Sequence, residues 1–334
     1  METPDLLPDL PGRGELVRRY AHLLHHFGKE IGSRPLVRQN AEFFPDRFDK
    51  DAPSVERLVR RLQTHAGLLD VPIGVRVLPL ELAEAGTNAS KSCGSGACGT
   101  GCGTPSVSES GAVARLEEHA SGWTLNVFDA ELHHPVALTT QLALALAEIF
   151  LSETSSAQAP VEAPRGVSRD LACVALGLGS LVLEGSYIYS KSCGGPSVTR
   201  LTELSVGELA IAQSLFIALR RVTTRRSGRG ALSELSTTQR ALLGEANDWA
   251  HSNASLVAQL AANPGQLATR APQVREARSW LLRVFERSPA AAAADELPEL
   301  PLDLPAQAVP QRAPRPRTRE QEELAALVEE ALRG

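Results

Sequence analysis

The segment from residue 135 to residue 153 is apolar on nearly every face of the helix that it would form. A helix of this kind has to be buried on all sides, so the chain is predicted to fold around a helical core. Because only 4% of the residues are aromatic while 43% are hydrophobic, leucine, alanine and valine must fill most of that core. Further segments with apolar residues at helical spacing cover 16–27, 55–66, 169–190, 206–222, 237–262 and 274–287.

Strand-forming patterns are confined to a short part of the chain. Residues 71–78 predict one strand, and residues 112–118 and 123–128 predict a β-hairpin around Ala120, Ser121 and Gly122. The expected fold class is therefore α+β, a mostly helical domain with a small antiparallel or mixed sheet.

Charge and hydropathy narrow the class of protein. The formal net charge of −5 does not favour a general nucleic-acid binder. No uninterrupted apolar stretch approaches the roughly 18 residues of a membrane-spanning helix. Residues 1–12 are acidic and proline-rich and lack the apolar segment of a secretory signal. We expect a soluble cytoplasmic protein that does not associate with membranes.

The composition changes near residue 287. Residues 1–287 are expected to form the globular domain, and residues 288–318 combine an alanine run with many prolines, which predicts a disordered linker. Residues 319–334 follow as a short amphipathic helix, in which the apolar side chains at positions 324, 327, 328 and 332 share one stripe. This helix, over residues 319–333, is either a docking peptide for a protein partner or a solvated helix that frays.

Four of the five cysteines lie in two glycine-rich segments of similar sequence. Ser-Lys-Ser-Cys-Gly occurs at residues 90–94 and again at residues 190–194. The pattern Cys-Gly-x-Pro-Ser-Val occurs at residues 102–107 and again at residues 193–198. The glycine- and cysteine-rich loop covers residues 90–107 and contains Cys93, Cys98 and Cys102, and the second segment contains Cys193.

Glycine-rich loops of this kind can bring several thiolates to one centre, because glycine allows tight turns and close backbone approach. A thiolate ligand set suits zinc or an iron–sulfur cluster better than magnesium or calcium. We therefore expect Cys93, Cys98, Cys102 and Cys193 to meet in space and bind one of these cofactors. A redox or regulatory thiol and an inert loop remain alternatives. Cys173 lies in an apolar run and is expected to be a small core residue.

Several short phrases resemble a group of uncharacterised bacterial proteins that look like zinc metallopeptidases. Phe43-Phe44-Pro45-Asp46 is similar to an early phrase of that group, and residues 123–128 with 131–135 are similar to its strand and helix entry. Asp170-Leu171 and residues 176–179 resemble its second helix, and residues 204–219 resemble the following one. The resemblance covers most of residues 35–221 and implies a metallopeptidase-like scaffold.

The zinc motif of that group is missing from this chain. Where the group carries His-Glu-x-x-His, this sequence has Thr140-Gln141-Leu142-Ala143-Leu144. Because a zinc-bound water needs the imidazole ligands and the carboxylate base, the resemblance implies a pseudoenzyme without peptidase activity. The expected function is a cytosolic accessory protein that binds a metal or iron–sulfur centre. A non-catalytic interaction protein and a thiol-dependent redox enzyme are the alternatives.

Overall fold

The computed structural model describes residues 7–28, 34–79, 115–154, 163–192, 195–224, 234–270 and 272–276. The chain divides into two units, Met1–Arg283 and Val284–Gly334, and all the described residues belong to the first. Loop 90–107, the linker 288–318 and the helix expected at 319–334 lie outside the described residues. The predicted division into domains therefore stays a prediction.

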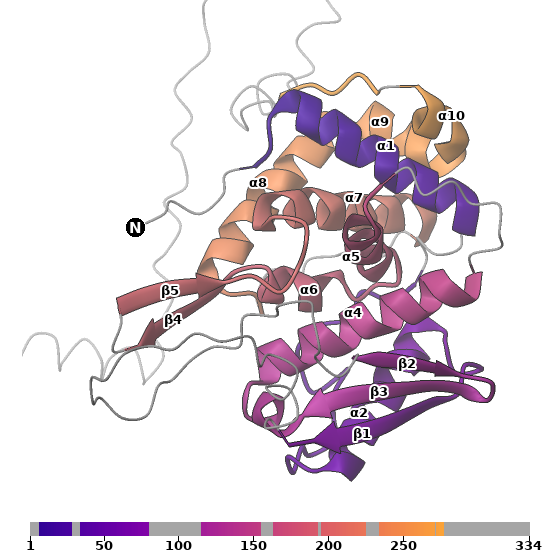
Figure 1. Ribbon diagram of the computed structural model, residues 1–334. Helices are drawn as coiled ribbons and strands as arrows, with labels where there is room; N and C mark the ends of the chain where they lie inside the picture. The colour runs from indigo at the N-terminus through magenta and orange to yellow at the C-terminus, as the bar shows by residue number, and fades with distance from the viewer. Residues whose placement is uncertain are drawn as a thin grey trace, which may run out of the picture. The chain divides into compact units, whose positions relative to one another are not determined.

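A small mixed sheet forms one side of the described unit (Figure 1). Its strands are β1 (Ile73–Leu78), β2 (Leu116–His119) and β3 (Gly122–Phe128), in the order β1-β3-β2. The β1 strand runs parallel to β3, and β2 runs antiparallel to it. The expected strand and hairpin are thus confirmed for the described residues. Gly122 begins β3 with a φ of +133°, and a Cβ there would lie 2.4 Å from the carbonyl oxygen of Pro72.

Helices make up most of the described structure. Helix α1 (Leu10–Phe27) is capped by Asp9, whose carboxylate accepts a hydrogen bond from the Gly12 amide at 2.9 Å. The same kind of cap starts α2 (Ala52–Ala66), where Asp51 accepts from the Ser54 amide at 2.9 Å. Such caps satisfy free amide groups at the helix start. The other helices are the 3-10 helix η2 (Asp129–His133), α4 (Pro135–Thr154), α5 (Arg165–Ala175), α6 (Gly179–Gly185), α7 (Val206–Thr224), α8 (Thr237–Ser252), α9 (Ala254–Ala262) and α10 (Pro264–Thr269).

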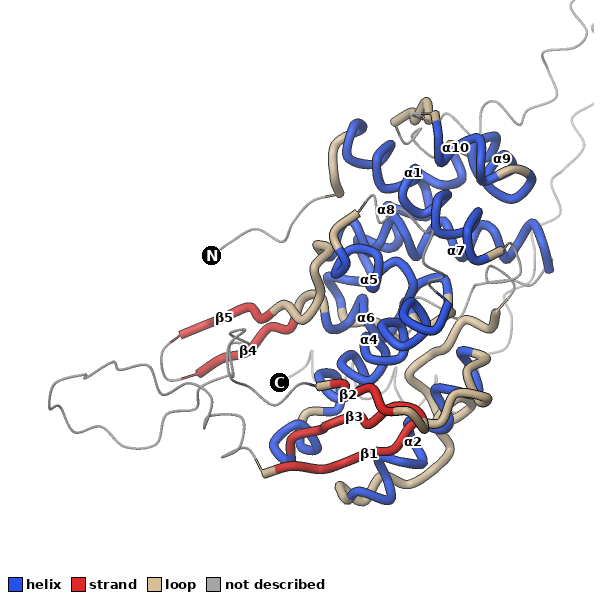
Figure 2. The backbone as a smooth tube through the Cα atoms, turned by 45° about the vertical axis from the view of Figure 1, so that its right-hand side comes forward, coloured by secondary structure: helices blue, strands red, loops and turns tan. Residues whose placement is uncertain are grey.

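Helix α4 lies between the sheet and the helices α5 and α6, as both Figure 1 and Figure 2 show. Leu138, Leu142, Leu146 and Ile149 on this helix are almost fully buried. At its end, Glu153 accepts a hydrogen bond from the indole nitrogen of Trp123 on β3 at 2.6 Å. By length and composition α4 would also suffice to cross a membrane, but 61% of its most apolar window is buried inside the fold. Its apolar side chains are therefore largely engaged in internal packing.

The single helix expected over residues 169–190 is wrong. The chain forms α5, turns at Gly177, forms α6 and then enters strand β4 (Ile188–Ser192), which pairs antiparallel with β5 (Gly195–Thr199). Gly177 has a φ of +83°, and its carbonyl accepts a hydrogen bond from the Val37 amide at 2.9 Å. A Cβ at this position would lie 2.1 Å from the carbonyl oxygen of Pro35, so only glycine fits this turn. Gly195 and Pro196 therefore begin a strand and do not end a helix.

The helix expected over residues 237–262 is also divided. It breaks at Asn253, between α8 and α9. The side-chain nitrogen of Asn253 donates hydrogen bonds to the carbonyl oxygens of Trp249 and Arg275 at 3.0 Å each. The side-chain oxygen of Asn253 accepts a hydrogen bond from the backbone amide of Arg275 at 3.0 Å. These bonds hold residues 274–276 in a non-helical conformation, so the helix expected over 274–287 does not begin at residue 274.

Candidate functional site

The cysteines proposed as ligands, Cys93, Cys98, Cys102 and Cys193, all lie outside the described residues. The structure does describe the strands on both sides of Cys193. Strands β4 and β5 pair from Ile188 with Thr199 to Ser192 with Gly195, so Cys193 and Gly194 are the two residues that connect them. The described structure thus places the second cysteine segment in a hairpin.

This hairpin extends away from the helices in both views (Figures 1 and 2). Across the strands the hydroxyls of Ser190 and Ser197 are 2.8 Å apart and form a hydrogen bond. The neighbouring pair, Tyr189 and Val198, is 53% and 43% exposed. The hairpin therefore presents an apolar pair to solvent beside the cysteine segment.

The fifth cysteine is a core residue, as expected. Cys173 on α5 is fully buried, and its thiol lies 3.3 Å from the carbonyl oxygen of Ala143 on α4. Burial raises the pKa of this thiol well above its usual value, and the nearby Asp170 carboxylate raises it further. Because metals bind the thiolate, a thiol held in this protonated state is a poor ligand.

The face of α4 that would carry a zinc motif is occupied by packing. Thr140 is fully buried, and its hydroxyl donates a hydrogen bond to the carbonyl oxygen of Leu181 on α6 at 2.9 Å. A Cβ added to Gly185 would lie 2.3 Å from the methyl and hydroxyl groups of Thr140. Leu144, at the second histidine position, is 3% exposed. An imidazole at residue 140 would not fit here without moving α6.

Asp170, which lies in the segment that resembles the second helix of those proteins, is also fully buried. One of its oxygens accepts hydrogen bonds from the Glu203 and Leu204 amides at 2.7 and 2.8 Å. The other lies 3.6 Å from the Nε atom of Arg169. Burial raises the pKa of Asp170 to about 6, against the effect of these amides and of Arg169. Asp170 thus holds the chain that leads into α7, which is a structural role.

Within the described ranges, no group of three or more histidine, cysteine, aspartate or glutamate side chains could hold a metal ion. This finding does not extend to loop 90–107 or to Cys193.

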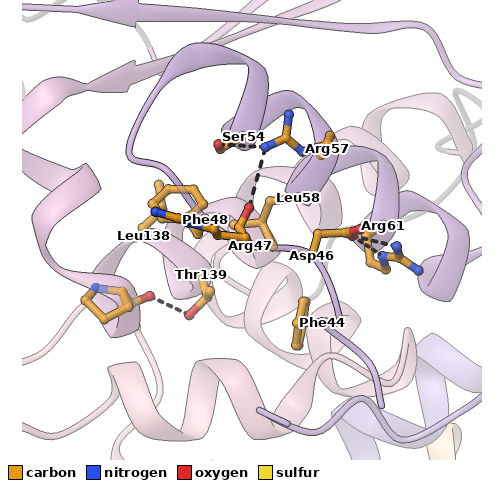
Figure 3. Close-up of a pocket in the computed structure, with 11 residues that line it drawn as sticks. Phe44, Asp46, Arg47, Phe48, Ser54, Arg57, Leu58, Arg61, Leu138 and Thr139 are labelled. Carbon is orange, nitrogen blue, oxygen red and sulfur yellow. Dashed lines mark hydrogen bonds and ion pairs between the residues drawn. The ribbon is translucent and has the colours of Figure 1, made fainter. Parts of the chain in front are cut away.

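A pocket that the sequence patterns did not predict lies between α2, the segment before it and the start of α4 (Figure 3). Its volume is about 180 Å³. In Figure 3, Arg57 and Arg61 lie along one border, while Leu138 and Thr139 lie at another. The local sequence signal is the phrase Phe43-Phe44-Pro45-Asp46, which supplies Phe44 and Asp46 to the pocket. The lining residues are Phe44, Asp46, Arg47, Phe48, Ser54, Arg57, Leu58, Arg61, Pro135, Leu138 and Thr139.

No protein-family model, curated protein or solved structure matches this chain. The structure defines a mixed α+β protein, mostly helical, with a small sheet. The resemblance to zinc-metallopeptidase-like proteins stays a prediction.

Proposed function

We propose that this chain is a cytoplasmic accessory protein that binds zinc or an iron–sulfur cluster through Cys93, Cys98, Cys102 and Cys193. The observation that carries the proposal is the recurrence of one cysteine phrase, whose second copy covers the end of β4 and most of β5, so that Cys193 falls in sequence between two paired strands. An antiparallel pair restricts the position of the residues that join its strands, so Cys193 would be held near one point while the other three cysteines approach it.

The length of chain between β1 and β2 supports a shared centre. These strands end at Leu78 and begin at Leu116, and the three other cysteines lie between them. An extended chain covers about 3.3–3.6 Å per residue, so this segment is long enough to cross a domain face. The proposal includes a cytoplasmic location, because thiols stay reduced there and remain free to bind a metal.

The proposed scaffold is that of a pseudo-peptidase. Its support is the packing of Thr140 and Leu144, which fills the positions where the resembling proteins carry zinc-binding histidines. In this proposal the helix at residues 319–333 binds a protein partner through its apolar stripe. Pull-down with the full chain and with a chain ending at residue 318 tests that role, and equal recovery of a partner by both would count against it.

Metal analysis of anaerobically purified protein tests the centre. Brown protein that contains iron and sulfide supports a cluster, and colourless protein with one zinc supports a structural zinc site. Cys193→Ser should lose as much metal as Cys98→Ser, because each removes one of four ligands. Cys173→Ala is the matched control and should keep full occupancy, since that thiol is buried away from any ligand role.

Two results would overturn the proposal. One is full metal occupancy in the Cys193→Ser variant, and the other is wild-type protein without metal under both aerobic and anaerobic purification. The second result would favour an interaction protein, to which the exposed Tyr189 and Val198 pair is suited, or a thiol-dependent redox enzyme.

A further inference from the structure

The pocket beside α2 has an apolar floor. Phe44 and Phe48 come from the segment before α2, Leu58 comes from α2 itself, and Leu138 comes from α4. An apolar cavity of about 150 Å³ is large enough for a benzene ring. The 180 Å³ of this pocket therefore suits one phenylalanine, leucine or similar side chain. It is smaller than the roughly 300–1,000 Å³ that sites for whole small-molecule ligands occupy.

The rim of the pocket is basic. Arg47, Arg57 and Arg61 line it, and their side chains are 91%, 47% and 35% exposed. Arg57 and Arg61 are four residues apart on α2, a spacing at which like charges destabilise a helix. These three cations pair with two carboxylates, Asp46 and Asp49, so the group keeps a net charge of +1 (three minus two) and favours an anionic ligand.

The three arginines differ in how closely a carboxylate neutralises them. Arg61 donates two hydrogen bonds to one Asp46 oxygen, at 2.5 and 3.0 Å. Arg47 lies 2.8 Å from an Asp49 oxygen. The distance from Arg57 to its nearest carboxylate oxygen, on Asp49, is 3.8 Å.

Arg57 is held in place by neutral acceptors. Its Nη2 atom donates to the Ser54 hydroxyl at 2.9 Å and to the Arg47 carbonyl oxygen at 3.5 Å. The Ser54 bond fixes the guanidinium at the pocket border without neutralising its charge. A ligand carboxylate would therefore pair with Arg57 more readily than with Arg61, where it would have to displace Asp46.

We propose that this pocket binds a short acidic peptide segment of a protein partner. One large apolar side chain of the peptide enters between Phe44, Leu58 and Leu138, and a carboxylate next to it in sequence pairs with Arg57. The size of the pocket indicates that one apolar side chain of the peptide enters it. The charge of the rim indicates that acidic residues lie next to that side chain in the peptide. This inference is independent of the cysteine centre, because every residue that it uses lies on α2, α4 or the segment before α2.

Fluorescence polarisation with the full chain tests the proposal. The probes are labelled five-residue peptides with two glutamates on each side of a central phenylalanine, leucine or tryptophan. The matched probes carry central alanine, or lysine flanks around the same apolar residue. At least one acidic apolar peptide should bind with a Kd below about 1 mM, about tenfold more tightly than its alanine counterpart. The lysine-flanked peptides should bind more weakly still.

Variants of the pocket separate the anchor from the charge. Arg57→Ala should weaken binding about tenfold, as expected for loss of a charge-assisted hydrogen bond. Arg60→Ala is the matched control, because Arg60 is exposed on the same helix and does not line the pocket; it should change the Kd less than about twofold. Thr139→Phe should block the pocket and abolish binding. Thermal melting of each variant shows whether the fold is retained.

Three outcomes would overturn the proposal. The first is that no acidic apolar peptide binds at 1 mM, which is roughly the weakest affinity of interest here. The second is that a central alanine binds as tightly as phenylalanine, leucine or tryptophan. The third is that Arg57→Ala and Arg60→Ala have equal effects, which would mean that only the general charge of α2 attracts the peptide.

Discussion

The hydroxyl of Thr140 on α4 donates a hydrogen bond to the carbonyl oxygen of Leu181 on α6, and both groups are buried. The backbone of α6 approaches so closely that a Cβ on Gly185 would overlap the Thr140 side chain. The contact between these two helices therefore depends on a small side chain at residue 140.

Thr140→His, which introduces a histidine where the resemblance would require the first zinc ligand, should destabilise the fold. An imidazole exceeds the space beside Gly185 and removes the bond to Leu181, so the free energy of unfolding should fall by about 2–4 kcal/mol. Urea denaturation measures this change. Thr139→His, one residue earlier on the less buried side of α4, is the control and should cost less than about 1 kcal/mol. An equal loss of unfolding free energy in the two variants would mean that α6 shifts readily to make room for the larger side chain.

The sequence predicted the sheet because its signals are local. Alternating apolar residues over 123–128 and the Ala120–Gly122 turn region describe a hairpin without reference to the rest of the chain. The segments that form α1, α2, α4 and α7 were predicted for the same reason, since apolar spacing along one segment defines a buried face, whereas α10 was not predicted.

The breaks between helices could not be predicted in the same way. The turn at Gly177 depends on a hydrogen bond from Val37, and the break at Asn253 depends on Arg275. Apolar spacing continues across both positions, so the pattern alone predicts one helix. The β4–β5 hairpin does carry a local signal, the glycine pair at residues 194 and 195, but such glycines are equally typical of the end of a helix.

For the candidate sites too, local patterns predict only what depends on neighbouring residues in the sequence. Cys173 was predicted as a core residue because its neighbours are apolar. The pocket was not predicted, because Phe44, Arg57 and Leu138 come from three segments that only the tertiary fold brings together. The proposed cysteine centre remains a prediction from the repeated phrase.

Cys173 should be inert in the folded protein. A variant with serine at residues 93, 98, 102 and 193 leaves it as the only thiol. Full burial and a raised pKa should prevent its reaction with a thiol-specific disulfide reagent at pH 8, whereas one thiol should react at once in urea. Fast reaction without denaturant would show that α5 opens or that the thiol is accessible.

Asn253 should contribute to stability through its contacts with Arg275. Asn253→Ala removes three hydrogen bonds and leaves the buried carbonyl oxygen of Trp249 and two part-buried backbone groups of Arg275 without these partners. The free energy of unfolding should fall by about 1–3 kcal/mol. Asn263→Ala is the control, because Asn263 is exposed and makes no capping bond from its side chain to α10. If chemical denaturation shows no difference between the two variants, the break between α8 and α9 does not depend on Asn253.

Asp170 should make the stability of the fold depend on pH. Burial raises its pKa in the folded protein to about 6, from a usual value of 3.8. Between these values the folded state keeps the proton while the unfolded state has lost it, so the free energy of unfolding falls as pH rises from about 4 to about 6 and then levels off. The fall due to this group should not exceed about 3 kcal/mol.

Asp170→Asn tests this dependence while keeping an oxygen that can accept from the Glu203 and Leu204 amides. Stability measured in urea between pH 4 and pH 7 is compared for the two proteins, so that the carboxylates they share cancel. The wild type should lose stability relative to the variant as pH rises through the window from 4 to 6, with a constant difference above it. A wild type that instead gains stability relative to the variant over this range would mean that the two amides and Arg169 outweigh burial, and that the pKa of Asp170 lies below 3.8.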